Sequence, residues 1–257
     1  MPINAKTKDR ISKKLKRYQN IVTKALEDDV NESDTVTIIT DILCEILGFD
    51  KYENLTSEYA IRKTFCDLAI KLGSRVPLLI ECKAVGIDLK EDHIRQATNY
   101  AAESGTEWVV LTNAKDWKIY KVTFTQPIDK QLIYEFNLLD LSARRPESFE
   151  VLYPLCIESF IKGIPAGLDA VYEKKQVLNR YVVGQLLVSE DVLGALRRKF
   201  KKLFPDIKID VDILEKMLKS EVIKRDVLEE DVAKDAAKLI RKAERKAAPK
   251  PAKKEET

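Results

Sequence analysis

Residues 67–84 read DLAIKLGSRVPLLIECKA, and this stretch decides the fold. In its first part, DLAIKL, polar or small residues alternate with large apolar ones, which is typical of a strand with one buried face. GSR follows and indicates a turn. VPLLIECKA, residues 76–84, is a continuous apolar run that ends in charge, as an interior strand does. The stretch therefore predicts a β-hairpin.

The sequence after the hairpin extends it into a larger sheet. Residues 89–104 predict a helix that is closed by Gly105. WVVLTN (108–113) and WKIYKVTF (117–124) predict two further strands. A strand, a helix of about four turns and another strand indicate a crossover between parallel neighbours.

The sequence before the hairpin predicts two helices and one strand. Residues 7–27 have apolar side chains at helical spacing. A second helix runs to Leu47 and stops at Gly48, and Ser33 or Asp34 can cap its start. A first strand is expected around 57–61. The order of these elements predicts an α/β fold with a mixed sheet flanked by helices.

The last third of the chain differs from the rest. Strand signals end near Phe136, and from Arg144 onward the pattern is helical. The final segment, AAPKPAKKEET, is low in complexity and is expected to be disordered. We therefore expect four parts: a basic N-terminal helix (1–30), an α/β core (31–143), a helical C-terminal region (144–246) and a disordered basic tail (247–257).

Composition indicates a soluble cytoplasmic protein. Of 257 residues, 45% are hydrophobic and 34% charged, and no apolar run approaches the length of a membrane span. No apolar segment follows the charges of the N-terminus, so it does not read as a secretory signal. The four cysteines lack metal-site or redox spacing and read as buried thiols in a reducing compartment: Cys44, Cys66, Cys82 and Cys156.

Positive charge is concentrated at the two ends. Residues 1–24 and residues 238–254 each carry eight Lys or Arg and one acid, a net charge of +7 apiece. Since the whole chain has a net charge of +3, the remainder carries −11. The basic ends could attract the protein toward a polyanion, or they could be solvated helix faces and a disordered tail.

Three charged residues of the hairpin predict a reactive centre. Side chains alternate across a strand, so Glu81 and Lys83 share one face at the end of an otherwise apolar strand. Asp67 begins the partner strand, and the 13 residues between Asp67 and Glu81 allow the hairpin to place the two carboxylates side by side.

Two converging carboxylates suit Mg²⁺, with Mn²⁺ as a substitute. We expect Asp67 and Glu81 to be metal ligands, with the backbone carbonyl of Cys82 as a further ligand. Lys83 would stabilise charge on a phosphate or orient the attacking water. The alternative is a surface salt bridge at a strand end with Asp67 as a turn cap, and a pattern this short recurs by chance.

The surrounding sequence resembles a known nuclease family. EYAIRKTFCDLAIKLGSRVPLLIECKAVGIDLKEDHIRQATNYAAESGTEWVVLTNAKDWKIYKV is similar to the N-terminal nuclease domain of type I restriction enzyme R (motor) subunits. It also resembles the stand-alone predicted type IV restriction endonucleases. Both belong to the PD-(D/E)xK superfamily, and the resemblance covers residues of about 33–125. It implies a restriction-endonuclease-like fold with Asp67, Glu81 and Lys83 as the catalytic triad.

The resemblance implies further site residues. The family's Q-x-x-x-Y motif matches Gln96 and Tyr100, with Gln96 as a catalytic residue at the site or the DNA backbone and Tyr100 as its support. An acidic residue of the preceding helix often joins the metal site in this family. Asp34, Asp41 and Glu45 share a face there, and Glu45 is the expected one. Cys66 stands where the family motif has its proline.

The leading hypothesis is a Mg²⁺-dependent endonuclease of a restriction or defence system that hydrolyses DNA phosphodiester bonds. No G-x-x-x-x-G-K-[ST] loop is present, so we expect neither a nucleotide cofactor nor a motor in this chain. The expected partners are DNA and either a second copy or other restriction-system subunits, with no membrane. Two alternatives stay open. One is a catalytically silent module that binds nucleic acid or protein on a nuclease-derived fold. The other is a helical oligomerisation surface carried by the nuclease-like core.

Overall fold

The computed structural model describes residues 3–61, 64–161 and 167–247. The chain forms two compact units, Met1–Tyr172 and Glu173–Thr257. All but the first residue of the expected tail, 247–257, lies outside the described residues. None of the described helices is long and apolar enough to cross a membrane.

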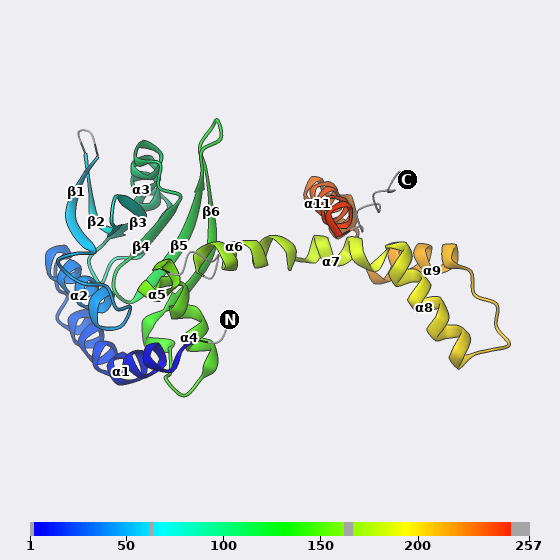
Figure 1. Cartoon of the computed structure of the whole chain (residues 1–257), viewed down its shortest axis with the longest axis horizontal. Coiled ribbons are helices and arrows are strands. Elements are labelled where there is room, and N and C mark those ends of the chain that lie inside the picture. The colour runs from blue at the N-terminus through cyan, green and yellow to red at the C-terminus, as the bar shows by residue number, and fades with distance from the viewer. Residues whose placement is uncertain (1–2, 62–63, 162–166, 248–257) are drawn as a thin grey trace, which may run out of the picture. The chain divides into compact units, whose positions relative to one another are not determined.

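The first unit is built on one six-stranded mixed sheet (Figure 1). Neighbouring strands follow chain order, and all pairs are antiparallel except β3–β4, which is parallel. The hairpin and the crossover predicted from the sequence are both confirmed, and with them the α/β fold. The strands are β1 (Leu55–Ile61), β2 (Thr64–Leu72), β3 (Arg75–Cys82), β4 (Trp108–Thr112), β5 (Asp116–Thr123) and β6 (Asp129–Asn137).

β6 was not singled out from the sequence. Its burial is weak, since only Ile133 is fully buried along the strand. β6 is an edge strand that pairs only with β5. Most of its side chains are exposed or half-buried, so its sequence lacks the apolar run of an interior strand.

Helices cover both faces of the sheet (Figure 1). One face packs against α1 (Ala5–Glu27) and α2 (Glu32–Glu45), where Leu15, Ile39 and Leu43 join Ile80 and Val110 of the sheet in one core. The other face packs against α3 (Glu91–Ser104), where Ile94 and Ala97 join Leu79, Val109 and Leu111 in a second core. β3 is therefore buried on both sides, which accounts for its continuous apolar run.

The start of α2 differs from the expectation. Asn31 is the N-cap, and its side chain accepts a hydrogen bond from the backbone nitrogen of Asp34 at 2.9 Å. Ser33 and Asp34 lie inside the first turn rather than capping it, because Asn31 satisfies the free backbone donor first. As a result Glu32 becomes the first residue of the helix.

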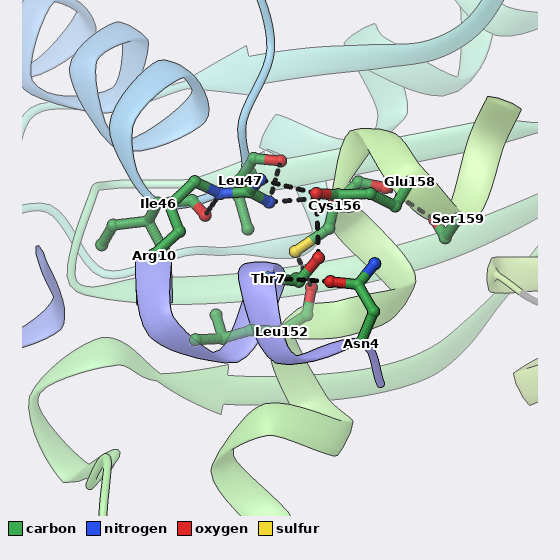
Figure 2. A network of polar contacts seen from close by, with 9 residues as sticks. All are labelled: Asn4, Thr7, Arg10, Ile46, Leu47, Leu152, Cys156, Glu158 and Ser159. Atoms are coloured by element: carbon green, nitrogen blue, oxygen red, sulfur yellow. Dashed lines mark hydrogen bonds and ion pairs between the residues drawn. The ribbon is translucent and has the colours of Figure 1, made fainter. Parts of the chain in front are cut away.

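A polar network ties α1 to the rest of the first unit (Figure 2). The Arg10 guanidinium donates to the carbonyls of Ile46 at 2.9 Å and Leu47 at 3.1 Å, just past the end of α2. It also donates to Glu158 at 2.6 and 2.9 Å, and the Thr7 hydroxyl donates to the same carboxylate at 2.9 Å. The N-terminal helix is thus part of the packed unit.

Residues 146–161 belong to the first unit as well. They form α4 (Pro146–Leu152), the 3₁₀ turn η2 (Tyr153–Leu155) and α5 (Ile157–Ile161). Leu152, Leu155 and Cys156 are buried in the core beneath α1 and α2. The division between the two compact units falls after Tyr172, so the first helices of the region expected from residue 144 onward belong to the first unit.

The second unit is helical, as the sequence predicted. Its helical structure is interrupted by a π-helical turn, η3 (Leu218–Val222), and by extended residues at Ile223 and Glu230. α6 (Leu168–Val177) spans the boundary between the units. The helices that follow it are α7 (Arg180–Leu187), α8 (Glu190–Leu203), α9 (Val211–Met217), α10 (Arg225–Glu229) and α11 (Asp231–Ala247).

Candidate active site

The hairpin brings the three charged residues of the sequence motif together. Leu68 of β2 pairs with Ile80 of β3, and Asp67 lies one residue beyond that pair. Asp67 Oδ2 accepts a hydrogen bond from the backbone nitrogen of Cys82 at 2.7 Å. Lys83 Nζ donates to Glu81 Oε1 at 2.8 Å. Two carboxylates and one ammonium therefore converge where β2 and β3 stop pairing.

Glu81 is the most constrained of the three. Its side chain is 0% exposed, and its Oε2 atom has no hydrogen-bond partner among the described residues. Burial raises the pKa of Glu81 to about 7, and Asp67 adds to the rise while Lys83 opposes it. A buried carboxylate oxygen without a partner is costly unless a cation or donor meets it.

Lys83 remains charged in this setting. Burial lowers the pKa of Lys83, but hydrogen bonding and attraction to Glu81, together with Glu32 and Asp67, raise it more. Its net pKa therefore lies above the ordinary value. The Lys83 side chain is 16% exposed, so it is not closed off from solvent.

The backbone of Cys82 also faces the carboxylates. The N–H and the C=O of one residue point to the same side of a strand. Because the Cys82 N–H donates to Asp67, the Cys82 carbonyl points toward β2 too, beyond the last residue that pairs with that strand. The Lys83 amide points the other way and donates to Thr112 of β4 at 2.9 Å.

Glu32 is a site residue that the sequence analysis missed. Its Oε2 lies 3.8 Å from Lys83 Nζ, and its charge contributes to the raised pKa of Glu81. The Thr35 hydroxyl accepts a hydrogen bond from the Val85 amide at 3.1 Å, which holds the first turn of α2 beside the segment after β3. The acidic run before the helix was the available signal, but the expected start at Ser33 or Asp34 left Glu32 outside the helix.

Glu45, the acidic residue expected at the metal site, contacts α1 instead of the triad. Its Oε2 lies 2.7 Å from Lys14 Nζ and 3.5 Å from Arg17 Nη1, both on α1. These contacts account for the lowered pKa of Glu45, with the hydrogen bond from Lys14 as the largest cause. Glu45 therefore joins α1 to α2, and Glu32 occupies the place near the triad.

The donor set fits a hard divalent cation. Asp67, Glu81 and Glu32 supply carboxylate oxygens, the Cys82 carbonyl supplies a neutral one, and the partnerless Oε2 of Glu81 is the position where a cation would relieve burial. The described residues contain no ready-made cluster of three or more His, Cys, Asp or Glu in metal-binding geometry. Asp67 is turned toward an amide and Glu81 toward Lys83, which accounts for this.

Gln96 and Tyr100 lie on α3 and contact each other. Gln96 Nε2 donates to the Tyr100 hydroxyl at 2.8 Å, and Tyr100 is 8% exposed in the second core. The contact joins the two residues of the motif, and the supporting role of Tyr100 at the site stays a prediction. Gln96 itself is exposed and lines a shallow hollow along α3 with Arg95 and Asn99. Within the described part of the chain no contact joins it to the triad, so its role at the site stays a prediction.

The comparisons with known proteins bear on this unit. Residues 38–133 match the family model described as type I restriction enzyme R protein N terminus. No curated protein and no solved structure matches the chain. The matched span includes Asp67, Glu81, Lys83 and Gln96 but not Glu32. This part of the chain is thus similar to the N-terminal domain of type I restriction enzyme R proteins, and its sheet fits a restriction-endonuclease-like fold.

Proposed function

We propose that the first unit is a metal-dependent endonuclease that hydrolyses DNA phosphodiester bonds as part of a restriction system. The observation that carries the proposal is the buried, partnerless carboxylate oxygen of Glu81 beside Asp67 and Lys83. It lies within the span that matches the restriction enzyme family. DNA, a second copy or other restriction-system subunits are the partners this proposal includes.

Each residue has a distinct part in the proposed reaction. Asp67, Glu81 and the Cys82 carbonyl would hold Mg²⁺ or Mn²⁺, with Glu32 at the rim. When bound, such an ion supplies Lewis acidity toward a phosphoryl oxygen and lowers the pKa of a water. Lys83 keeps its positive charge and would stabilise the charge that develops on the phosphate. Gln96, on exposed α3, would contact the DNA backbone.

A plasmid-nicking assay with Mg²⁺, Mn²⁺ or EDTA tests the proposal. Asp67→Asn and Glu81→Gln should abolish nicking and metal binding, as followed by calorimetry, because each removes a ligand charge. Lys83→Met should abolish nicking while metal binding survives. Glu53→Gln is the matched control, since Glu53 is exposed in the same unit and should leave both readouts unchanged.

The alternative of a silent binding module predicts a different pattern. In that case the wild-type chain binds neither Mg²⁺ nor Mn²⁺, and Glu81→Gln leaves every activity intact. That result would overturn the nuclease proposal.

A further inference from the structure

The second half of α8 presents a dense group of positive charges. Five cations occur within six consecutive residues, and all five are exposed. We call them the basic face: Arg197, Arg198, Lys199, Lys201 and Lys202. The stretch covers about 8 Å of helix axis, at about 1.5 Å per residue.

The five cations of the basic face have no ion-pair partner within the described residues, and none of them forms a side-chain hydrogen bond there. Other cations of the second unit pair with nearby acids, as in Arg225–Glu229 at 2.8 Å and Lys238–Asp235 at 2.9 Å. Charge left without an internal partner is available to an external anion.

The first part of the apolar side of α8 packs within its own unit. Leu193 is 2% exposed, and Leu196 and Phe200 are half-buried at helical spacing from it. This part packs within the second unit, where α8 contacts α9 and α7. Arg198 and Lys202 are four residues apart and so share a face of the helix. That face lies opposite the side of Leu193 and Phe200. Leu203, at the end of the apolar side, is 58% exposed, so lipid binding is an outcome that the experiment must distinguish from DNA binding.

We propose that the basic face of α8 binds the phosphate backbone of duplex DNA. Duplex DNA carries one negative charge per about 1.7 Å of axis, counted over both strands, so its charge density is comparable with that of the basic face. The choice of DNA rests on the proposed function of the first unit. Contacts of this kind position a duplex and do not read its sequence.

Fluorescence anisotropy of the full chain with a labelled duplex tests the proposal. The test variant is Arg198→Gln/Lys199→Gln/Lys201→Gln/Lys202→Gln. The control variant, Lys219→Gln/Arg225→Gln/Lys234→Gln/Lys238→Gln, removes the same charge from cations that are ion-paired in the same unit. In EDTA the test variant should lose at least about tenfold in affinity. The magnitude of its slope of log K against log salt should decrease by about 3 to 4, as expected for four lost phosphate contacts. The control should change both values far less.

Three results would overturn the proposal. They are unchanged DNA binding by the test variant, an equal loss in both variants, or tighter binding to phosphatidylserine vesicles that the test variant loses. Circular dichroism checks folding, and the double variant Arg198→Gln/Lys202→Gln replaces the test variant if that fails to fold. Because binding is measured in EDTA, the outcome is separate from nicking. DNA binding that persists in a chain that never cleaves contradicts only the nuclease proposal.

Discussion

The carboxylate of Asp67 accepts a hydrogen bond from the backbone amide of Cys82, with 2.7 Å between Oδ2 and the nitrogen. This bond crosses the point where β2 and β3 cease to pair, so it holds Asp67 beside the strand end that carries Glu81 and Lys83. Hydrogen bonds to a charged acceptor are stronger than neutral ones. Asp67 is therefore fixed beside Glu81 and Lys83 before any ligand arrives.

Glu81→Gln should stabilise the metal-free protein at pH 8. The folded-state pKa of Glu81 is raised by burial from an ordinary 4.5 to about 7. The unfolded chain thus loses its proton first, and the stability due to the neutral carboxyl is lost as the pH rises from about 4.5 through 7. Glutamine cannot ionise, so the free energy of unfolding of Glu81→Gln should exceed that of the wild type by about 3 kcal/mol at pH 8. The difference should nearly vanish at pH 4. Urea denaturation in EDTA measures this, and parallel pH profiles of the two proteins would contradict it.

Glu158→Gln should show the opposite pH dependence. Burial raises the pKa of Glu158, but the hydrogen bonds from Arg10 and Thr7 and the charge of Arg10 lower it more, so the net pKa is lowered. The stability from this carboxylate is present above its ordinary pKa and is lost as the pH falls. We expect a cost of about 1 to 3 kcal/mol at pH 7 that disappears in acid. Urea denaturation across pH checks it against Glu150→Gln, an exposed position of α4 that should stay neutral throughout.

Gly48→Ala should cost more stability than Gly73→Ala. Both glycines have positive φ angles, +87° and +61°, so alanine is strained at either position by about 1 to 2 kcal/mol. A Cβ atom at residue 48 would also lie 2.5 Å from Arg10 Cζ, whereas at residue 73 nothing lies within 4 Å. Arg10 would have to leave the carbonyls past α2, which adds about 1 to 3 kcal/mol. Thermal denaturation of both variants compares them, and equal losses would show that the Arg10 network contributes little.

Thr35→Val should weaken the connection between α2 and the strand end. The Thr35 side chain is 0% exposed, and its hydroxyl accepts from the Val85 amide at 3.1 Å and donates to the Asn31 carbonyl at 2.8 Å. Valine has a similar shape but leaves the buried amide without a partner, at a cost of about 1 to 3 kcal/mol. Amide hydrogen exchange at Val85 should accelerate. Thr37→Val, an exposed change on the same helix, is the control and should leave that exchange rate unchanged.

The sequence by itself determined the centre of the first unit. The alternating DLAIKL run, the GSR turn and the apolar VPLLIECKA run specify a hairpin, because local periodicity encodes which faces are buried. The same alternation placed Glu81 and Lys83 together, and the short loop brought Asp67 beside them. These features depend on residues close in the chain, so the sequence was sufficient.

Only the tertiary structure decided which more distant groups join this centre. Glu45 is drawn to Lys14 and Arg17 of another helix, while Glu32 approaches Lys83 because Asn31 caps α2 and Thr35 holds the Val85 amide. Likewise Leu152, Leu155 and Cys156 join the helices after the sheet to the first unit by packing into its core. A carboxylate or an apolar side chain has many possible partners along a chain. Packing between remote segments selects among these partners, and no local sequence pattern records that packing. This is the physical reason why the sequence alone did not predict them.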